Sequence, residues 1–305
     1  RQAYARLKTL LSSLPDDDQR TALPAPKNTL AVENIVVVPP GAKTPSVQGV
    51  SFELKAGDGL GIIGPSAAGK SSLARAIVGV WPLPKGHVRL DGAAIDQWHP
   101  EVLGRHIGYL PQDIELFDGT VAENISRFEE ESSDEQIVAA AELAGVHELI
   151  VKLTDGYETQ IGESGSTLSA GQRQRIGLAR ALYGNPFLIV LDEPNSNLDS
   201  EGEAALTRTI RQLRALDKIV IVIAHRPSAI DAVEKVLVMA EGCVKAFGPK
   251  VEVLKSVLAP VPTPAAAAKK ENKPASSSEP LPPLSIPRFL GKTASVHVMP
   301  KRDRK

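Results

Sequence analysis

Short apolar runs alternate with longer amphipathic segments over most of the chain. IVIVIA at Ile219–Ala224 and GLGII at Gly59–Ile63 are uninterrupted apolar runs, with the length expected for strands that are buried on both faces. FLIVLD at Phe187–Asp192 has the same character but ends in an acid. Further strands are predicted at 30–38, 47–54, 87–90, 106–110 and 235–240.

Helical patterns occupy several of the intervals between these strands. Two strand-like runs come first and strands then alternate with helices, which favours an α/β fold with a mainly parallel sheet and an antiparallel β subdomain. The stretch 129–145 has no buried strand of its own, so it is predicted to be an inserted α-helical subdomain. The predicted helices are 71–80, 134–144, 171–183, 200–216 and 251–258.

The two ends of the chain differ from the part between them. Residues 1–29 read as an amphipathic helix (1–14) followed by a linker that contains spaced prolines. The helix is expected either to pack on the main domain or to be the end of a longer helix that precedes it. Residues 259–305 are rich in Pro, Ala, Ser and Lys and are expected to be a disordered tail, because they offer little apolar surface to bury. One domain is therefore predicted at 30–258.

Composition and charge narrow the class of protein. Apolar residues make up 42% of the 305 residues but aromatic residues only 4%, so the core is expected to be built from Val, Ile, Leu and Ala. The formal net charge of −1 provides no positive field that would attract nucleic acid, which is not expected as a partner. The single cysteine, Cys243, excludes an internal disulfide framework. No apolar run approaches the roughly 20 residues of a membrane-spanning helix.

The segment GPSAAGKSS follows a predicted strand and opens a predicted helix. It matches the pattern G-x-x-x-x-G-K-[ST], in which backbone N–H groups surround the oxygens of a nucleotide phosphate. Lys70 would add a positive charge for the β- and γ-phosphates, and the Ser71 hydroxyl would bind Mg²⁺. A P-loop NTPase core that binds ATP and Mg²⁺ is therefore predicted. Its expected nucleotide-binding residues are Gly64, Pro65, Ser66, Ala67, Ala68, Gly69, Lys70, Ser71 and Ser72.

Polar side chains that suit hydrolysis follow three other predicted strands. A strand that stops at Asp192 and Glu193, expected next to the strand of the phosphate loop, would hold both acids at the carboxyl edge of a parallel sheet, where α/β proteins bind ligands. Asp192 is expected to bind Mg²⁺, and Glu193 to act on the attacking water as a general base or as an orienting acceptor. His225 is expected to reach the γ-phosphate, and Gln112 to contact Mg²⁺ or water. The predicted catalytic residues are Glu193, His225 and Gln112, and the predicted metal ligands are Ser71, Gln112 and Asp192.

TLSAGQRQRIGLARAL, Thr167–Leu182, is a second turn followed by a helix, and the free N–H groups at its start suit an anion. The phosphates of one ATP are already assigned to the first loop. A second copy of the chain is therefore expected to supply the phosphate. In a head-to-tail pair, Ser169 and the N–H groups of Ala170 and Gly171 would face the γ-phosphate that the partner holds. Loss of this phosphate on hydrolysis would release the pair.

Six motifs together resemble the nucleotide-binding domain of ABC transporters: GPSAAGKS, LPQD, LSAGQRQ, LIVLDEP, SNLD and AHRPS, in this order and spacing. The resemblance spans about Leu30–Leu258. It implies that Gln172 and Asp199 also belong to the nucleotide site. The family's signature usually reads LSGGQ, and this chain departs from it at Ala170. The implied motifs are Walker A at 64–71, the Q-loop at Gln112, the signature at 168–172, Walker B ending at Asp192, the D-loop at 196–199 and the H-loop at His225.

Further segments resemble particular members of this family. LFDGTVAENI, 116–125, is similar to the exporter type, and VVVPPGAKTP and DEPNSNLD resemble type I secretion exporters. The resemblance implies a homodimer fused to a transmembrane domain whose last helix would end in 1–14. It also implies a periplasmic adaptor, an outer-membrane channel, an exported protein substrate, and a location at the cytoplasmic face of the bacterial inner membrane.

Three other functions fit the same motifs. The first is a separately encoded importer subunit, which the exporter-like segment 116–125 argues against. The second is a soluble ABC ATPase that acts on nucleic acid or ribosomes, but the chain has one cassette and no heptad run. The third is a regulatory module that binds ATP without hydrolysing it, which the presence of Glu193 and His225 argues against.

Overall fold

The computed structural model describes most of the predicted domain and little of the two ends. The predicted tail at 259–305, most of the predicted helix at 1–14, and His225 lie outside the described residues. Within the described part, no helix combines the length and the apolar character needed to cross a bilayer. The described residues are 4, 6–8, 23–162, 165, 167–224 and 230–258.

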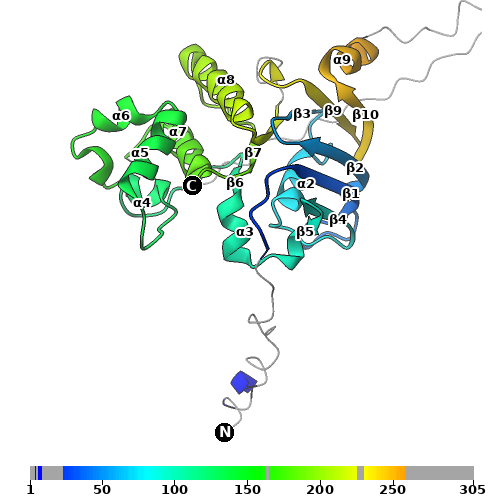
Figure 1. Cartoon of the computed structure of the whole chain (residues 1–305), viewed down its shortest axis with the longest axis horizontal. Helices are drawn as coiled ribbons and strands as arrows, with labels where there is room; N and C mark the ends of the chain where they lie inside the picture. Colours follow the sequence, from blue (N-terminus) through cyan, green and yellow to red (C-terminus); the bar gives the residue numbers. More distant parts are fainter. Residues whose placement is uncertain are drawn as a thin grey trace, which may run out of the picture. The chain divides into compact units, whose positions relative to one another are not determined.

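A mainly parallel sheet forms the centre of the described part (Figure 1), with the strand order β10-β9-β3-β8-β7-β6. All neighbouring strands run parallel except β10, which is antiparallel to β9. Its strands are β3 (Gly59–Ile63), β6 (Ile107–Leu110), β7 (Leu188–Asp192), β8 (Ile219–Ile223), β9 (Lys235–Ala240) and β10 (Cys243–Pro249). The sequence predicts all of these except β10, whose short alternating pattern is interrupted by Gly and Pro.

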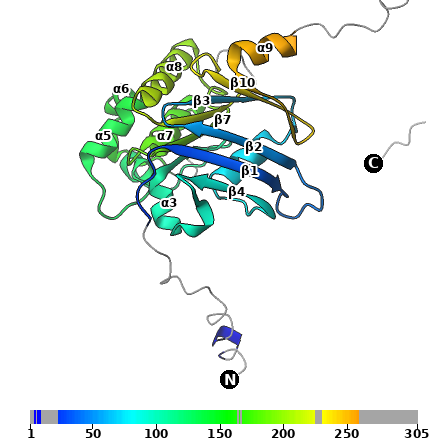
Figure 2. The ribbon, with the colours of Figure 1, turned by 45° about the vertical axis from the view of Figure 1, so that its right-hand side comes forward.

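A second, antiparallel sheet has the strand order β2-β1-β4-β5 and lies over one face of the central sheet (Figure 2). Its strands are β1 (Thr29–Val37), β2 (Val47–Lys55), β4 (Lys85–Leu90) and β5 (Ala93–Ala94). Apolar side chains alternate with exposed polar ones along β2, as expected for a sheet with one buried face. The predicted antiparallel subdomain is therefore confirmed.

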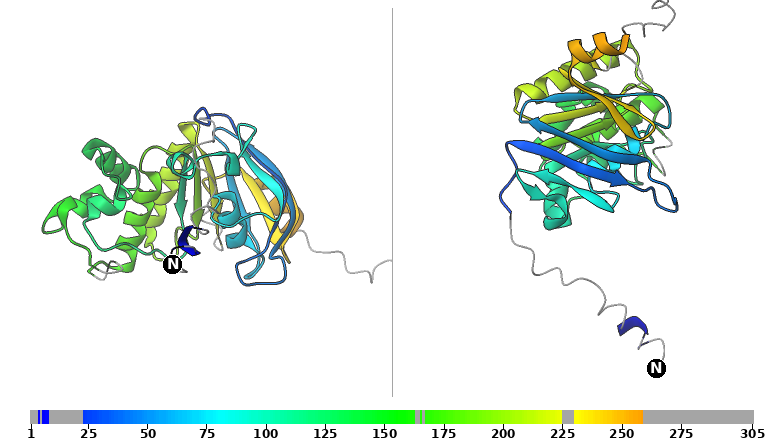
Figure 3. Two further views of the ribbon diagram at one scale, coloured as in Figure 1. Left: turned by 90° about the horizontal axis from the view of Figure 1, so that it is seen from below. Right: turned by 90° about the vertical axis from the view of Figure 1, so that its right-hand side faces the viewer.

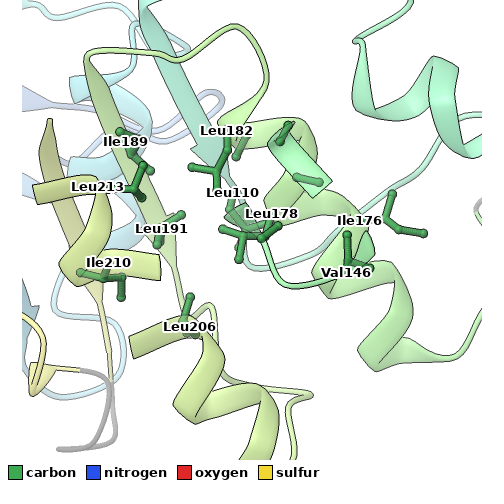
Figure 4. Packing of buried hydrophobic residues seen from close by; sticks show 14 of the residues in the cluster. Leu110, Val146, Ile176, Leu178, Leu182, Ile189, Leu191, Leu206, Ile210 and Leu213 are labelled. Carbon is green, nitrogen blue, oxygen red and sulfur yellow. The ribbon is translucent and has the colours of Figure 1, made fainter. Parts of the chain in front are cut away.

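Two apolar clusters cover the two faces of the central sheet. Leu188 and Val190 join β1, β2 and β4 in one cluster, while Ile189 and Leu191 join the helices on the other face (Figure 4). This alternation follows from the period of two along a strand. It explains why β7 and β8 read as unbroken apolar runs, since every residue of both strands is buried.

Helices occupy both faces of the central sheet (Figure 3). Helix α2 (Lys70–Ile77) packs between the two sheets. On the opposite side lie α5 (Asp134–Leu143), α7 (Ala170–Leu182) and α8 (Ser200–Ala215). The other helices within the described residues from 23 onward are α3 (Pro100–His106), α4 (Val121–Ile125), α6 (His147–Val151), α9 (Lys250–Leu258) and the 3₁₀ turns η2 (Ile95–Gln97) and η3 (Gly156–Glu158).

The helical part of the chain is larger than the predicted insertion at 129–145. It begins with α4 and continues beyond α6, and these helices have only five residues each, too few for a periodic pattern. The half-buried side chain of Arg127 ties this part to the rest of the domain. The Arg127 guanidinium donates to the carbonyl oxygens of Gly104 (2.7 Å) and Arg180 (3.0 Å), so it links the chain after α4 to α3 and to the end of α7.

Candidate nucleotide site

The loop between β3 and α2 is held in a conformation that needs glycine. Gly64 and Gly69 have φ angles of 155° and 92°. A Cβ atom on Gly69 would meet the carbonyl oxygen of Ser46, which leaves no room for a side chain. Ala67 adopts a left-handed φ of 61°, a costly conformation for a residue with a side chain. The sequence carries no signal for this strain at Ala67.

Gly69→Ala is expected to lower the free energy of unfolding by about 3 kcal/mol, because both the φ angle and the contact with Ser46 are unfavourable for alanine. Gly92→Ala is the matched control. Gly92 has a φ angle of 83°, but a Cβ atom at this position would have nothing within 4 Å, so a loss of about 1 kcal/mol is expected. Urea unfolding of both variants measures the difference. Equal losses would show that the loop can move away from Ser46.

Lys70 begins α2 and points back across the loop. Its side chain is 6% exposed, and Nζ donates to the carbonyl oxygens of Gly64 (3.0 Å) and Pro65 (2.8 Å). Burial lowers the pKa of Lys70, and the nearby charges of Glu193 and Asp192 partly oppose this shift. A buried ammonium group within a glycine-rich loop at a helix N-terminus suits a polyanion.

Asp192, the last residue of β7, is a buried carboxylate without regular hydrogen bonds. It is 0% exposed, and neither oxygen has a hydrogen-bond partner of good geometry among the described residues. Burial raises the pKa of Asp192, and the Ser71 hydroxyl lowers it in part. Because buried polar atoms are nearly always partnered, an acceptor pair of this kind beside a hydroxyl fits a divalent cation with oxygen ligands. The residues present therefore fit Mg²⁺.

Asp192→Asn is expected to stabilise the nucleotide-free chain while removing this cation ligand. The folded state holds the Asp192 proton more tightly than the unfolded chain does, because burial raises the pKa of this carboxyl group. The free energy of unfolding therefore falls as the pH rises from the unfolded pKa through the raised folded pKa. Asparagine stays neutral, and the thermal midpoint at pH 8 should rise by about 2–4 °C, the effect of about 1 kcal/mol. The difference should shrink as the pH falls. A variant that melts lower at pH 8 would show that the carboxylate is stabilising.

The cleft beside the loop brings several predicted residues together. It has a volume of about 400 Å³ and is lined by Ser66–Ser72, Ser46, Gln112 and Glu193. Glu193 adopts a left-handed φ of 52°, and its N–H donates to the carbonyl oxygen of Ile223 in β8 (3.0 Å). The predicted catalytic residues Gln112 and Glu193 thus share one cleft with Lys70 and Ser71.

One detail of the predicted arrangement is wrong. The strand that carries Asp192 is not next to the strand of the phosphate loop, because β8 lies between β3 and β7. The order of strands depends on how distant segments pair, which local patterns do not encode. Strand β8 therefore ends between the strand of the loop and the strand of the acids. His225 follows β8 in the sequence and lies outside the described residues.

The second predicted phosphate site lies elsewhere in the same chain. Ser169 caps α7: its Oγ accepts from the Gln172 N–H (3.2 Å), and its N–H donates to Gln172 Oε1 (2.8 Å). Ala170 begins this helix with a negative φ, so the methyl group that departs from the usual signature causes no strain. None of the residues 169–172 lines the cleft of the first loop. Figure 1 shows α7 among the other helices, apart from α2.

Asp199 is engaged within its own chain. It caps α8 by accepting from the Gly202 N–H (2.8 Å), and it pairs with Arg175 of α7 at 3.2 Å. Asp199 does not line the cleft either. The structure therefore gives Asp199 a local role and leaves a contact with nucleotide as an expectation.

Comparisons with known proteins decide the family. Residues 47–196 match the ABC transporter family model. The chain carries an ABC transporter ATP-binding domain. This confirms the predicted family and the P-loop α/β fold, and it makes the described part an ATPase domain that binds nucleotide. The ATP-binding domain thus contains both the loop between β3 and α2 and the start of α7, which Ser169 caps.

Individual relatives agree with the exporter resemblance. The chain is 58% identical over 260 residues to the type I secretion system ATP-binding protein PrsD of Rhizobium meliloti (strain 1021), covering 85% of this chain and 45% of that protein. It is 39% identical to the ATP-dependent lipid A-core flippase of Aliivibrio fischeri (strain ATCC 700601 / ES114), covering 75% and 39%. The chain thus spans less than half the length of these relatives.

A solved structure supports the same fold. The ATP-binding domain superimposes on a bacterial Atm1-family ABC exporter with ATP bound, with a TM-score of 0.74 and 31% identity. The match covers 83% of this chain and 45% of that one.

Proposed function

We propose that this chain contains the motor domain of an ABC exporter for type I protein secretion, in which two copies enclose ATP and hydrolyse it with Mg²⁺. One observation carries the proposal. The chain has two loop-to-helix turns whose free N–H groups suit a phosphate, the loop before α2 and the start of α7, and only the first lines the cleft that contains Glu193. The second element is explained if it faces the nucleotide of another copy. The 58% identity to a type I secretion ATP-binding protein supports the assignment to protein export.

Within one chain, the loop Gly64–Ser72 would bind the phosphates of ATP through its N–H groups and the Lys70 ammonium. Ser71, Asp192 and Gln112 would hold Mg²⁺, which would neutralise charge on the β- and γ-phosphate oxygens. Glu193 lines the cleft and would accept a proton from the attacking water. The oxygen of that water would bond to the γ-phosphorus while the bond from the γ-phosphorus to ADP breaks. His225 would contact the γ-phosphate from the segment after β8.

Across the dimer, the start of α7 would close the site of the other chain. The Ser169 side chain caps its own helix, so the direct contacts with phosphate would come from the N–H groups of Ala170 and Gly171, which have no acceptor inside the helix. Gln172 and Asp199 would also contribute to this site. ATP would therefore join the two chains, and loss of the γ-phosphate would separate them.

Ser169→Arg is expected to leave ATP binding to the single chain within about twofold of wild type but to lower hydrolysis by about a hundredfold, because the bulky cation blocks the partner's γ-phosphate. A fluorescent ATP analogue and phosphate release measure the two effects. Ser132→Arg, on an exposed residue before α5, is the control and should match wild type. A fully active Ser169→Arg protein would contradict the two-chain site.

The wider assembly follows from the same proposal. The domain would occupy 30–258, residues 1–29 would connect it to a transmembrane domain, and 259–305 would form a tail. The partners would be a periplasmic adaptor, an outer-membrane channel and an exported protein, at the cytoplasmic face of the bacterial inner membrane. A separately encoded importer subunit or a soluble ABC ATPase is the alternative. Reading the parent gene upstream of Arg1 distinguishes them, since about six apolar segments of roughly 20 residues are expected for a fused exporter.

A further inference from the structure

The start of α7 is fastened to the segment after Glu193 by one buried side chain. Gln174 is 2% exposed and lies in the second turn of α7. Its Nε2 donates to the carbonyl oxygens of Pro194 (2.7 Å) and Glu193 (3.3 Å). Its Oε1 accepts from Asn197 Nδ2 (2.9 Å) and from Ser196 Oγ (3.3 Å). Helix α7, whose start is proposed to face the partner's phosphate, is thus bonded to the segment that begins at Glu193, an acid that lines the cleft of the first loop.

This side chain has no unused polar capacity. A primary amide has two N–H donors and an oxygen with two acceptor positions, and Gln174 uses all four. A flipped amide would place its oxygen against the two carbonyl oxygens and its NH₂ group against the Asn197 NH₂ group, which can only donate. The network therefore selects one orientation, and it fixes the distance between α7 and residues 193–197.

Two neighbouring contacts strengthen the same junction. Arg175 of α7 pairs with Asp199 at 3.2 Å. Gly171 packs so closely that a Cβ atom there would lie 3.1 Å from the carbonyl oxygen of Asn197. The first two turns of α7 and residues 193–199 are therefore expected to move as one body.

We propose that Gln174 is a positioning residue that couples the two ATP sites of the dimer. This inference rests on the proposed function, in which Glu193 acts on the ATP of its own chain while Ala170 and Gly171 contact the ATP of the partner. When the start of α7 settles on the partner's γ-phosphate, the Gln174 bonds set the position of the Glu193 backbone in the same chain. The two sites then become competent together, which appears in kinetics as positive cooperativity in ATP.

Gln174→Leu in the full chain tests this coupling, because leucine fills a similar volume without polar atoms. ATP affinity at protein concentrations too low for pairing should stay within about twofold of wild type. The maximal rate should fall about tenfold, and the Hill coefficient should fall from near 2, the number of sites, to about 1. Gln212→Leu makes the same replacement on an exposed position of α8 and should leave every value unchanged.

A second variant keeps the test decisive if Gln174→Leu does not fold. Asn197→Ala removes one of the four hydrogen bonds from an exposed residue and should lower the Hill coefficient in the same direction, by less. A wild-type Hill coefficient above 1 that both folded variants retain would overturn the coupling role, even if their thermal midpoints fall. A wild-type Hill coefficient of 1 would instead contradict the two-chain site itself.

Discussion

Replacing Glu193 with glutamine is expected to lower the maximal rate of ATP hydrolysis by about 10³-fold while ATP binding and ATP-dependent dimers persist. Glu193 follows β7 directly and lines the same cleft as the phosphate loop and Gln112. Glutamine has the same size and keeps an acceptor oxygen, but it cannot take a proton from water. Phosphate release and light scattering with ATP measure the two effects.

The control for this variant is Glu252→Gln, an exposed acid in α9 that does not line the cleft. It should hydrolyse ATP at the wild-type rate. If Glu193→Gln also retains the wild-type rate, the water is activated by another group. If instead it loses ATP-dependent dimers together with activity, Glu193 contributes to binding rather than to the chemical step.

Replacing Lys70 with alanine is expected to weaken ATP binding by about a hundredfold, or about 3 kcal/mol. The Lys70 ammonium is nearly buried and is aimed by the carbonyl oxygens of Gly64 and Pro65, so no solvent-exposed lysine can replace it. The charges of Asp192 and Glu193 act on the Lys70 pKa, so both acids lie near its ammonium group. Loss of Lys70 therefore leaves these two negative charges without a nearby cation. Both changes act against a bound polyanion. A fluorescent ATP analogue measures the affinity.

Lys245→Ala is the matched control, because the Lys245 side chain is half exposed and its ion pair with Glu241 is long, at 3.9 Å. It should bind ATP like wild type. A circular dichroism melt of Lys70→Ala separates lost binding from lost folding. An unchanged affinity in a folded Lys70→Ala protein would remove Lys70 from the nucleotide site.

The parts of the site that could be predicted are those that local sequence determines. The glycine-rich loop between an apolar strand and a helix, the acids at the end of β7, and the Ser169 cap of α7 each depend on neighbours within a few residues. The buried strands β7 and β8 could be predicted for the same reason, since their apolar runs reflect burial on both faces.

Other features depend on contacts between distant segments. The position of β8 between β3 and β7 results from strand pairing across more than a hundred residues, and no periodic pattern carries it. The bonds of Gln174 join two segments about twenty residues apart, so the sequence shows only another polar residue in a polar helix. The strained φ angle of Ala67 is imposed by the loop around it.

The two-chain site is tested most directly by cross-linking. Ser66 and Ser169 are both exposed, and only Ser66 lines the cleft. Two variants are made, Ser66→Cys and Ser169→Cys. Both also carry Cys243→Ser, which removes the one other cysteine of the sequence, and Glu193→Gln, which preserves bound ATP. The two variants are mixed, ATP and Mg²⁺ are added, and a short bismaleimide is applied. A head-to-tail pair predicts a cross-linked dimer in the mixture with ATP, none without ATP, and none from either variant by itself. A mixture that yields no ATP-dependent dimer would contradict the two-chain site.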